Sequence, residues 1–316
     1  MYSNIYNINS GVKKNSVQKT DNLGIRLSDF VREFLSYASS DRRPGTVKIF
    51  KAALKKFVEM TNDIFLSDLT ARHFDRYKSL RASQISPTTT NIELRALRAA
   101  FRTAVRWKYL SSDPFLETRL IPIPQTEKAF ISQSDFPKLI STIREPWLRD
   151  TIFFAALTGL RREELISLTK SDYDAVNNQI VIKSNANFKT KNGKIRVIPL
   201  ALAAQYIIKS RLELNASEYV FYLKDGKKIS GDYLTHKFKK YVRQVGLSEE
   251  IRLHSLRHSY ASWLAQNGTN LFVLQRLLGH GNISTTQIYA HLSMNDLRSG
   301  VLNLPDFKQF LNDAPK

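Results

Sequence analysis

A proline-rich stretch at residues 113–129 (DPFLETRLIPIPQTEKA) divides the chain into two parts. It holds three prolines and shows little hydrophobic periodicity. Proline lacks a backbone donor and fits neither a helix interior nor a central strand, so such a stretch is typical of an extended linker. With 316 residues, the chain is long enough for two domains that each bury a core. We therefore expect one domain over residues 24–112 and a second over 130–316.

The first part of the chain has the pattern of a helical domain. Residues 1–23 are polar and lack periodicity, so they are expected to form a flexible N-terminal tail. Behind them, apolar residues recur at helical spacing in four segments. These predicted helices span about 27–39, 46–60, 67–82 and 87–110.

The fourth segment, which begins at Pro87, carries two parallel rows of side chains. Its apolar row has the spacing of a buried helix face and consists of Leu94, Leu97, Phe101 and Val105. A basic row runs beside it, offset by one residue, and no carboxylate follows Glu93 within the segment. A row of guanidinium groups without acidic neighbours favours contact with phosphates. The DNA-contact candidates are therefore Arg95, Arg98, Arg102 and Arg106, together with Lys48 and Lys51 from the second predicted helix.

The charge of the chain points to a polyanionic partner. Lys and Arg number 48 against 28 Asp and Glu, a formal net charge of +20, which favours nucleic acid. The absence of cysteine excludes disulfides and thiolate chemistry. No segment has the roughly 20 apolar residues of a membrane helix, and the N-terminus lacks the apolar core of a signal peptide. We expect a cytoplasmic protein without a membrane partner.

The second part is expected to be mainly helical with a small antiparallel sheet. Apolar runs predict strands at 179–183 and 194–200, and Asn192-Gly193 between them is a strong hairpin signal. Helices are predicted on both sides of Gly159 and near the C-terminus. The further helical segments are about 134–143, 200–213, 231–245 and 304–313.

Residues 254–291 contain the most informative cluster of the chain. Four of its six histidines fall there. His254 and Arg257 are three residues apart and would share a helix face. Gly279 after an apolar run predicts a helix end, and Ser284 is expected to cap a short helix that carries Tyr289.

These residue types suit chemistry at a phosphodiester. A tyrosine hydroxyl, with an ordinary pKa of about 10, is a weak nucleophile until its charged form is stabilised. Guanidinium forks and imidazole donors fit the non-bridging phosphate oxygens. Arginine, histidine and tyrosine in one pocket are what an enzyme forming a phosphotyrosine needs.

The order of these residues resembles the C-terminal signature of the tyrosine recombinase (phage integrase) family. That signature has His-x-x-Arg, then Leu-Gly-His, then a nucleophilic tyrosine nine residues after that histidine. His254, Arg257, His280 and Tyr289 stand at these positions. The TTxN…LRALRxAFxxAV pattern within 87–110 resembles the family's SAM-like core-binding domain.

Two further positions match the family upstream. Arg161 lies in TGLRREEL, which resembles the family's first arginine box, and Glu164 is expected to buttress an arginine. Lys191, at the predicted hairpin tip, matches the family's catalytic lysine, and Lys194 stays open as the alternative. His258 and His291 are expected to be structural. The candidate catalytic set is Arg161, Lys191, His254, Arg257, His280 and Tyr289.

The resemblance implies a fold, a reaction and its partners. Two domains would clamp a specific site in double-stranded DNA, as a homo-oligomer, expected to be a tetramer. Tyr289 would form a 3′-phosphotyrosine, with His254 as the candidate to take its proton and Lys191 protonating the leaving oxygen. No metal, ATP or other cofactor is expected. The segment after Tyr289 would dock on a protomer, in cis or in trans.

Two alternatives stay open. One is a type IB topoisomerase, which relaxes DNA without strand exchange. The other is a non-catalytic DNA-binding relative of the integrases. The sequence does not specify the DNA site, any accessory proteins, or the choice between integration of a mobile element and resolution of chromosome dimers.

Overall fold

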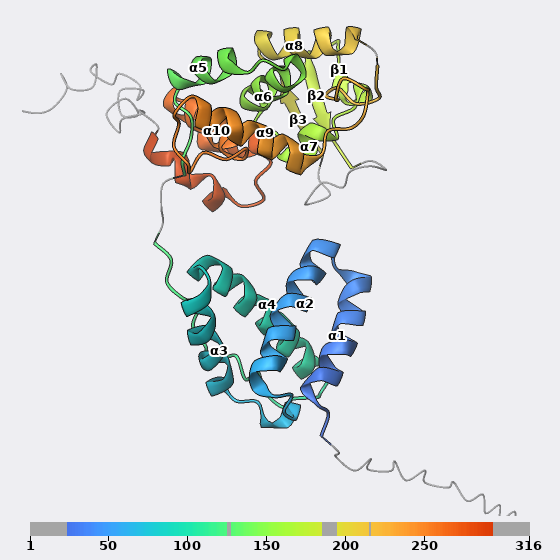
Figure 1. Cartoon of the computed structure of the whole chain (residues 1–316), viewed down its shortest axis with the longest axis vertical. Helices are drawn as coiled ribbons and strands as arrows, with labels where there is room; N and C mark the ends of the chain where they lie inside the picture. The colour runs from blue at the N-terminus through green and yellow to red at the C-terminus, as the bar shows by residue number, and fades with distance from the viewer. Residues whose placement is uncertain (1–23, 125–127, 185–194, 215, 293–316) are drawn as a thin grey trace, which may run out of the picture. The chain divides into compact units, whose positions relative to one another are not determined.

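The computed structural model describes residues 24–124, 128–184, 195–214 and 216–292. It divides the chain into two compact units, Met1–Gln125 and Thr126–Lys316. Within the described residues, no helix has both the length and the apolar character needed to span a lipid bilayer. The two units are described separately below (Figure 1).

The described part of the first unit consists of four α-helices and one 3-10 turn. Helices α1 and α2 are joined by a short turn, α2 packs against both α1 and α4, and α3 packs against α4 (Figure 1). The predicted helices are confirmed, except that the third begins later because Leu66–Asp68 forms a separate 3-10 turn. Thr70 and His73 then cap α3 reciprocally. The helices are α1 (Leu27–Asp41), α2 (Pro44–Thr61), α3 (Ala71–Gln84) and α4 (Pro87–Arg106).

Aromatic rings fill the centre of this unit. Phe57, Phe74 and Phe101 are completely buried, with ring centroids 4.9–5.5 Å apart. Such edge-to-face and offset contacts add stability beyond the apolar area that they bury. The predicted apolar row of α4 lies in this core, although Val105 at its C-terminal end is only half-buried.

A buried polar network joins α3 to α4. Arg81 makes a two-pronged ion pair with Glu93, at 2.7 Å for both Nε and Nη2, and the Tyr77 hydroxyl donates to the same carboxylate at 2.9 Å. Burial raises the pKa of Tyr77, and the adjacent Glu93 carboxylate raises it further. Glu93, which the sequence shows only as the last acid before the arginine row, is therefore a structural partner of Arg81.

We expect Glu93→Ala to destabilise the first unit by about 3–5 kcal/mol, because it leaves the Arg81 guanidinium buried without its partner. Urea denaturation of the full chain measures this loss, and the unfolding transition of the first unit is the signal that is monitored. Glu117→Ala removes an exposed carboxylate from the same unit and is the matched control, expected to change stability by less than about 0.5 kcal/mol. Equal effects of the two substitutions would contradict the structural role of Glu93.

The first half of the expected linker belongs to the first unit. Phe115 is completely buried and lies 5.0 Å from the Phe74 ring. The Asn91 side chain donates to the Ile121 carbonyl at 2.8 Å and accepts from the Ile121 amide at 2.9 Å. The proline-containing segment forms no strand ladder, and its backbone groups are instead paired by local turns and by side chains such as Asn91.

The second unit is mainly helical and has one small sheet (Figure 1). Strand β2 pairs antiparallel with β3, as predicted, and a two-residue strand β1, which the sequence did not indicate, pairs with β2. Its helices are α5 (Asp135–Thr142), α6 (Pro146–Thr158), α7 (Arg162–Ile166), α8 (Leu202–Glu213), α9 (Gly231–Gln244), α10 (Ser255–Gln266) and α11 (Leu271–Leu278). The strands and 3-10 turns are η2 (Lys170–Asp172), β1 (Tyr173–Asp174), β2 (Gln179–Ile182), β3 (Arg196–Pro199), η3 (Ile283–Thr285) and η4 (Gln287–Leu292).

The core of this unit places the elements of the site. Helix α10 packs against α6, α11 and η4, and α11 also packs against β3. Ile180 and Ile198, paired across β2 and β3, are completely buried below these helices. The predicted hairpin tip with Lys191 and Lys194, and the helix expected at 304–313, lie outside the described residues.

Candidate active site

A buried carboxylate organises one side of the site. Glu164, on α7, is 4 % exposed. Its two oxygens accept from Arg161 Nη1 and Arg196 Nη2, both at 2.8 Å, and the Arg161 backbone amide donates to it as well. Burial alone would raise the pKa of Glu164, but Arg196 and Arg161 outweigh it and hold that pKa below its usual range. The predicted buttressing role of Glu164 is consistent with these contacts, and they explain an arginine at a helix N-terminus.

A second arginine is held by the ends of two helices. Arg257, on α10, is 3 % exposed. It donates to the Gly159 carbonyl, which ends α6, at 2.7 Å, and to the Leu278 carbonyl, which ends α11. Carbonyls at helix C-termini lack intrahelical partners and carry partial negative charge, so they suit a cation. The guanidinium is thus fixed before any substrate binds.

Both helices end in glycines that no other residue could replace without strain. Gly159 and Gly279 adopt positive φ, 61° and 64°, as helix caps. A Cβ on Gly159 would lie 2.4 Å from the Tyr260 ring, and one on Gly279 would lie 2.6 Å from an Arg196 nitrogen. The Gly279 carbonyl in turn accepts from Arg161 at 3.2 Å. The helix end that the sequence predicted at Gly279 is therefore also the point where the arginines meet.

The resulting cluster carries excess positive charge. Arg161, Arg196 and Arg257 come together around one carboxylate, Glu164. Burial lowers the pKa of Arg257 to about 9, and the neighbouring Arg161 and Arg196 contribute to the lowering. Cations that disfavour one another are stabilised by an anion placed between them. The cluster therefore has the electrostatics of an oxyanion site.

Two of the predicted histidines border this cluster. His254, at the start of α10, has its pKa lowered by burial and then by Arg257 and Arg161. His280, just after the cap at Gly279, bonds through Nδ1 to the Thr286 hydroxyl at 2.9 Å. Burial, followed by Arg257, lowers the pKa of His280 to about 4. Both rings would be neutral at pH 7 and able to donate one N–H to a phosphate oxygen.

Tyr289 lies on η4, a short 3-10 helix rather than the start of an α-helix. The preceding turn η3 is capped by Asn282, whose side chain accepts from the Ser284 amide, and not by Ser284 as predicted. Tyr289 is 3 % exposed. Burial raises its pKa to about 12, while the positive charge of Arg257 acts to lower it. The candidate nucleophile is thus near the arginine cluster but shielded from water.

The Tyr289 hydroxyl contacts His258, which the sequence predicted to be structural. His258 Nδ1 and Tyr289 Oη are 2.6 Å apart. On α10 alone, His258 lies about 100° from Arg257, on another side of the helix. The contact arises because η4 packs against α10, which helical spacing does not indicate.

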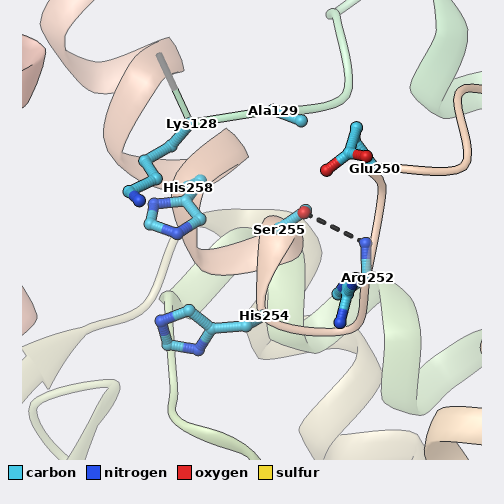
Figure 2. A pocket seen from close by; sticks show the side chains of 7 residues that line it. All are labelled: Lys128, Ala129, Glu250, Arg252, His254, Ser255 and His258. Carbon is cyan, nitrogen blue, oxygen red and sulfur yellow. Dashed lines mark hydrogen bonds between the residues drawn. The ribbon is translucent and has the colours of Figure 1, made fainter. Parts of the chain in front are cut away.

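A pocket opens beside these histidines. It has a volume of about 620 Å³ and is lined by Lys128, Ala129, Glu250, Arg252, His254, Ser255 and His258. Figure 2 shows the His254 and His258 rings on the same side, with the Lys128 side chain reaching toward His258. The two rings are edge-on with centroids 5.0 Å apart. In the described ranges, no three His, Asp or Glu side chains gather so as to hold a metal ion.

The four arginines of α4 that are predicted to contact DNA differ in their neighbours and in their exposure. Arg98 stacks over the Phe115 ring at 4.6 Å and donates to the Thr118 carbonyl. Arg102 forms an exposed ion pair with Asp113 at 3.4 Å, so the row does have an acidic neighbour, supplied from outside the helix. Arg106 lies over the Tyr37 ring. Arg95 is exposed, as are Lys48 and Lys51 on α2.

Sequence reasoning missed Arg196 and His258. Arg196 begins β3, and its guanidinium donates to Leu278 and Glu164. The sequence signal for Arg196 was its position in the predicted strand at 194–200, directly after a basic hairpin. Lys191, the sixth candidate, lies outside the described residues, so its place in the site stays a prediction.

Two family models match the chain. The model described as phage integrase family matches residues 129–296, and the one described as phage integrase SAM-like domain matches residues 26–120. The first model covers all six catalytic candidates, and the second covers the four α-helices of the first unit.

Relatives and solved structures resemble the chain over most of its length. The tyrosine recombinase XerA of Thermococcus onnurineus (strain NA1) is 28% identical over 282 residues, which cover 86% of this chain and 94% of that protein. The Tn1549 transposon integrase, solved with transposon right end DNA, has a TM-score of 0.75 at 19% identity and covers 89% of this chain and 99% of that one. A lambda integrase tetramer on a Holliday junction has a TM-score of 0.72 at 19% identity, covering 87% and 84%.

Proposed function

This chain belongs to the phage integrase family of tyrosine recombinases, and from that membership we propose that it is a site-specific recombinase of double-stranded DNA. It cuts and rejoins strands through a 3′-phosphotyrosine intermediate. One observation carries the assignment of the site: three guanidinium groups surround a single carboxylate beside a buried tyrosine. That arrangement binds a phosphodiester and stabilises added negative charge on it.

The reaction follows from these groups. Tyr289 Oη gives its proton to a neighbouring histidine and forms a bond to phosphorus, and the bond from phosphorus to the 5′-oxygen breaks. Arg161 and Arg257 donate to the non-bridging oxygens, on which charge increases in the transition state. His254 and His280 donate hydrogen bonds to the same phosphate. Lys191 gives the leaving 5′-oxygen its proton. The free 5′-hydroxyl of a partner strand then attacks the phosphotyrosine and reverses the sequence, so no external energy source is needed.

The expected partners are DNA and further copies of this chain. The similar Tn1549 and lambda integrases were solved bound to DNA, the lambda integrase as a tetramer on a Holliday junction. Strand exchange between two duplexes needs four nucleophiles, so we propose a tetramer of this chain on two recombination sites. We place the protein in the cytoplasm, where such a DNA substrate is accessible. Residues beyond 292, with the predicted helix at 304–313, are proposed to join protomers on DNA.

Purified protein mixed with a supercoiled plasmid that carries two copies of its recombination site tests the function. The expected products are covalent protein–DNA adducts and recombinant joints. Relaxation of the plasmid without recombinant joints would instead identify a topoisomerase of the same chemistry. Binding without any strand cleavage would identify a non-catalytic relative and refute the proposal.

The exposed Arg95 is expected to contribute a phosphate contact that Arg98 does not. Replacing Arg95 by Gln should reduce the slope of log affinity against log salt concentration by about 0.9, the value for one lost contact. Arg98→Gln is the matched control on the same helix, and we expect it to leave the slope unchanged because its guanidinium is engaged by Phe115 and Thr118. Fluorescence anisotropy with a labelled duplex at several salt concentrations measures both slopes. A reversed order of the two effects would contradict this assignment.

A further inference from the structure

His258 occupies an unusual place between the nucleophile and the open pocket. Its Nδ1 lies 2.6 Å from Tyr289 Oη, on an element more than thirty positions later in the chain. The same residue lines the pocket of about 620 Å³ together with Lys128 and His254 (Figure 2). The imidazole ring therefore has a buried hydroxyl on one side and a solvent-accessible pocket on the other.

The Tyr289 hydroxyl needs such an intermediary. With Tyr289 only 3 % exposed, its proton has no direct route to bulk water. A proton acceptor must lie within hydrogen-bond distance of the hydroxyl, about 2.6–3.2 Å, and His258 satisfies this condition. The contact comes from His258 rather than from His254, which we had considered for this role from the sequence.

We propose that His258 is the general base that removes the proton of Tyr289 during DNA cleavage, an inference that rests on the proposed function. As Oη bonds to phosphorus, the hydroxyl proton moves to His258 Nδ1, and the ring, protonated on both nitrogens, becomes an imidazolium. The electron pair of the breaking P–O bond goes to the 5′-oxygen, which takes a proton from Lys191. In rejoining, His258 returns its proton to Tyr289, and in the meantime Nε2 exchanges protons with water in the pocket.

The charge around His258 keeps it in the form that a base requires. Burial lowers the pKa of His258 to about 4, and His254, Lys128 and Arg257 contribute to the lowering. Tyr289 faces it from η4, and His280 lies close enough to interact with it electrostatically. The ring is therefore neutral at pH 7, which leaves a ring nitrogen able to accept a proton, and the 2.6 Å contact places Nδ1 at the hydroxyl. The lowered pKa of His258 and the raised pKa of Tyr289 oppose the transfer, so the proton moves only as Oη bonds to phosphorus. The base is lost only as the pH falls toward the pKa of His258.

A suicide duplex with a nicked site traps the cleaved state and tests the proposal. His258→Asn keeps an acceptor oxygen near the Tyr289 hydroxyl but cannot take its proton. We expect His258→Asn to form the covalent adduct about 10²–10⁴ times more slowly than the wild type in single-turnover assays with saturating protein. Its rate should rise with pH between 7 and 9, as hydroxide that enters from the pocket lined by His258 takes over from the missing base. DNA affinity and thermal unfolding temperature are expected to stay unchanged.

A duplex with a bridging 5′-phosphorothiolate separates base from acid. A sulfur leaving group needs no proton, so Lys191→Ala should regain cleavage on it, whereas His258→Asn should stay slow. Imidazole added to His258→Ala, in which it can enter from the pocket, should restore part of the rate. His236→Ala removes an exposed histidine of α9 and is the control. We expect it to keep the wild-type cleavage rate, with no change when imidazole is added.

The results distinguish this proposal from the function on which it rests. Wild-type protein that forms no adduct would refute the proposed function itself, whereas Tyr289→Phe that still forms one would place the nucleophile at another residue. With adduct formation by the wild type established, a His258→Asn rate within threefold of it would overturn the role of His258. Recovery of His258→Asn on the phosphorothiolate would also overturn it, because His258 would then act on the leaving group.

Discussion

Replacing Tyr289 by phenylalanine is expected to abolish the covalent protein–DNA adduct and to leave DNA affinity nearly unchanged. The substitution removes only the hydroxyl, which is the proposed nucleophile. The ring keeps its place in the apolar cluster with Leu274 and Leu278. The nicked suicide duplex, resolved on a denaturing gel, measures the adduct, and a gel-shift titration measures binding.

Tyr260→Phe is the matched control, because Tyr260 is a buried tyrosine of the same cluster. Its hydroxyl is proposed to take no part in the reaction, so the adduct should form at a rate close to that of the wild type. If Tyr289→Phe retained the covalent band, the nucleophile would have to be another residue. If both variants lost it, the assay would be reporting the packing of the cluster rather than the loss of a nucleophile.

Arg161→Gln is expected to slow cleavage by about 10²–10³-fold at saturating protein, the cost of losing one donor to a developing oxyanion. The side chain of Arg161 is 29% exposed, so its loss should not unfold the unit. Glu164 would keep its contact with Arg196 at 2.8 Å. The rate of adduct formation in a single turnover is the measurement, with thermal unfolding as the test of folding.

The adjacent Arg162 provides the control for that substitution. It pairs with Glu163 and Asp232 at the surface of α7 and α9. Arg162→Gln removes the same charge one residue away, and we expect it to change the cleavage rate by less than threefold. A similar loss in both variants would mean that the net charge of the unit, rather than a directed contact from Arg161, supports the reaction.

The sequence predicted the architecture and the region of the site well, because both depend on local patterns. Helical periodicity located the apolar row of α4, and alternation with an Asn-Gly turn located β2 and β3. The spacing from His254 to Tyr289 marked the residues that the fold brings to one place. Those patterns involve residues that are close together in the chain, so a single sequence is enough to recognise them.

The sequence did not indicate contacts between distant segments. The contact of His258 with Tyr289 was not predicted because Tyr289 comes from η4. The stacking of Arg98 on Phe115 was not predicted because Phe115 lies in a stretch whose prolines indicated a linker. Arg196 was not among the candidates because its contacts, with Glu164 and the end of α11, come from other segments. In each case the deciding neighbour is set by packing of whole elements, on which periodicity carries no information.

The carboxylate of Glu164 also helps to hold strand β3 in its alignment with β2. Arg196 pairs with Ile182 across the sheet and is tied at its other end to Glu164 and the Leu278 carbonyl. A slip of β3 by one residue would turn that guanidinium to the opposite face of the sheet and break both ties. The contacts of Arg196 with Glu164 and Leu278 therefore hold β3 in one alignment, so that the register of the sheet and the position of the arginine cluster depend on each other.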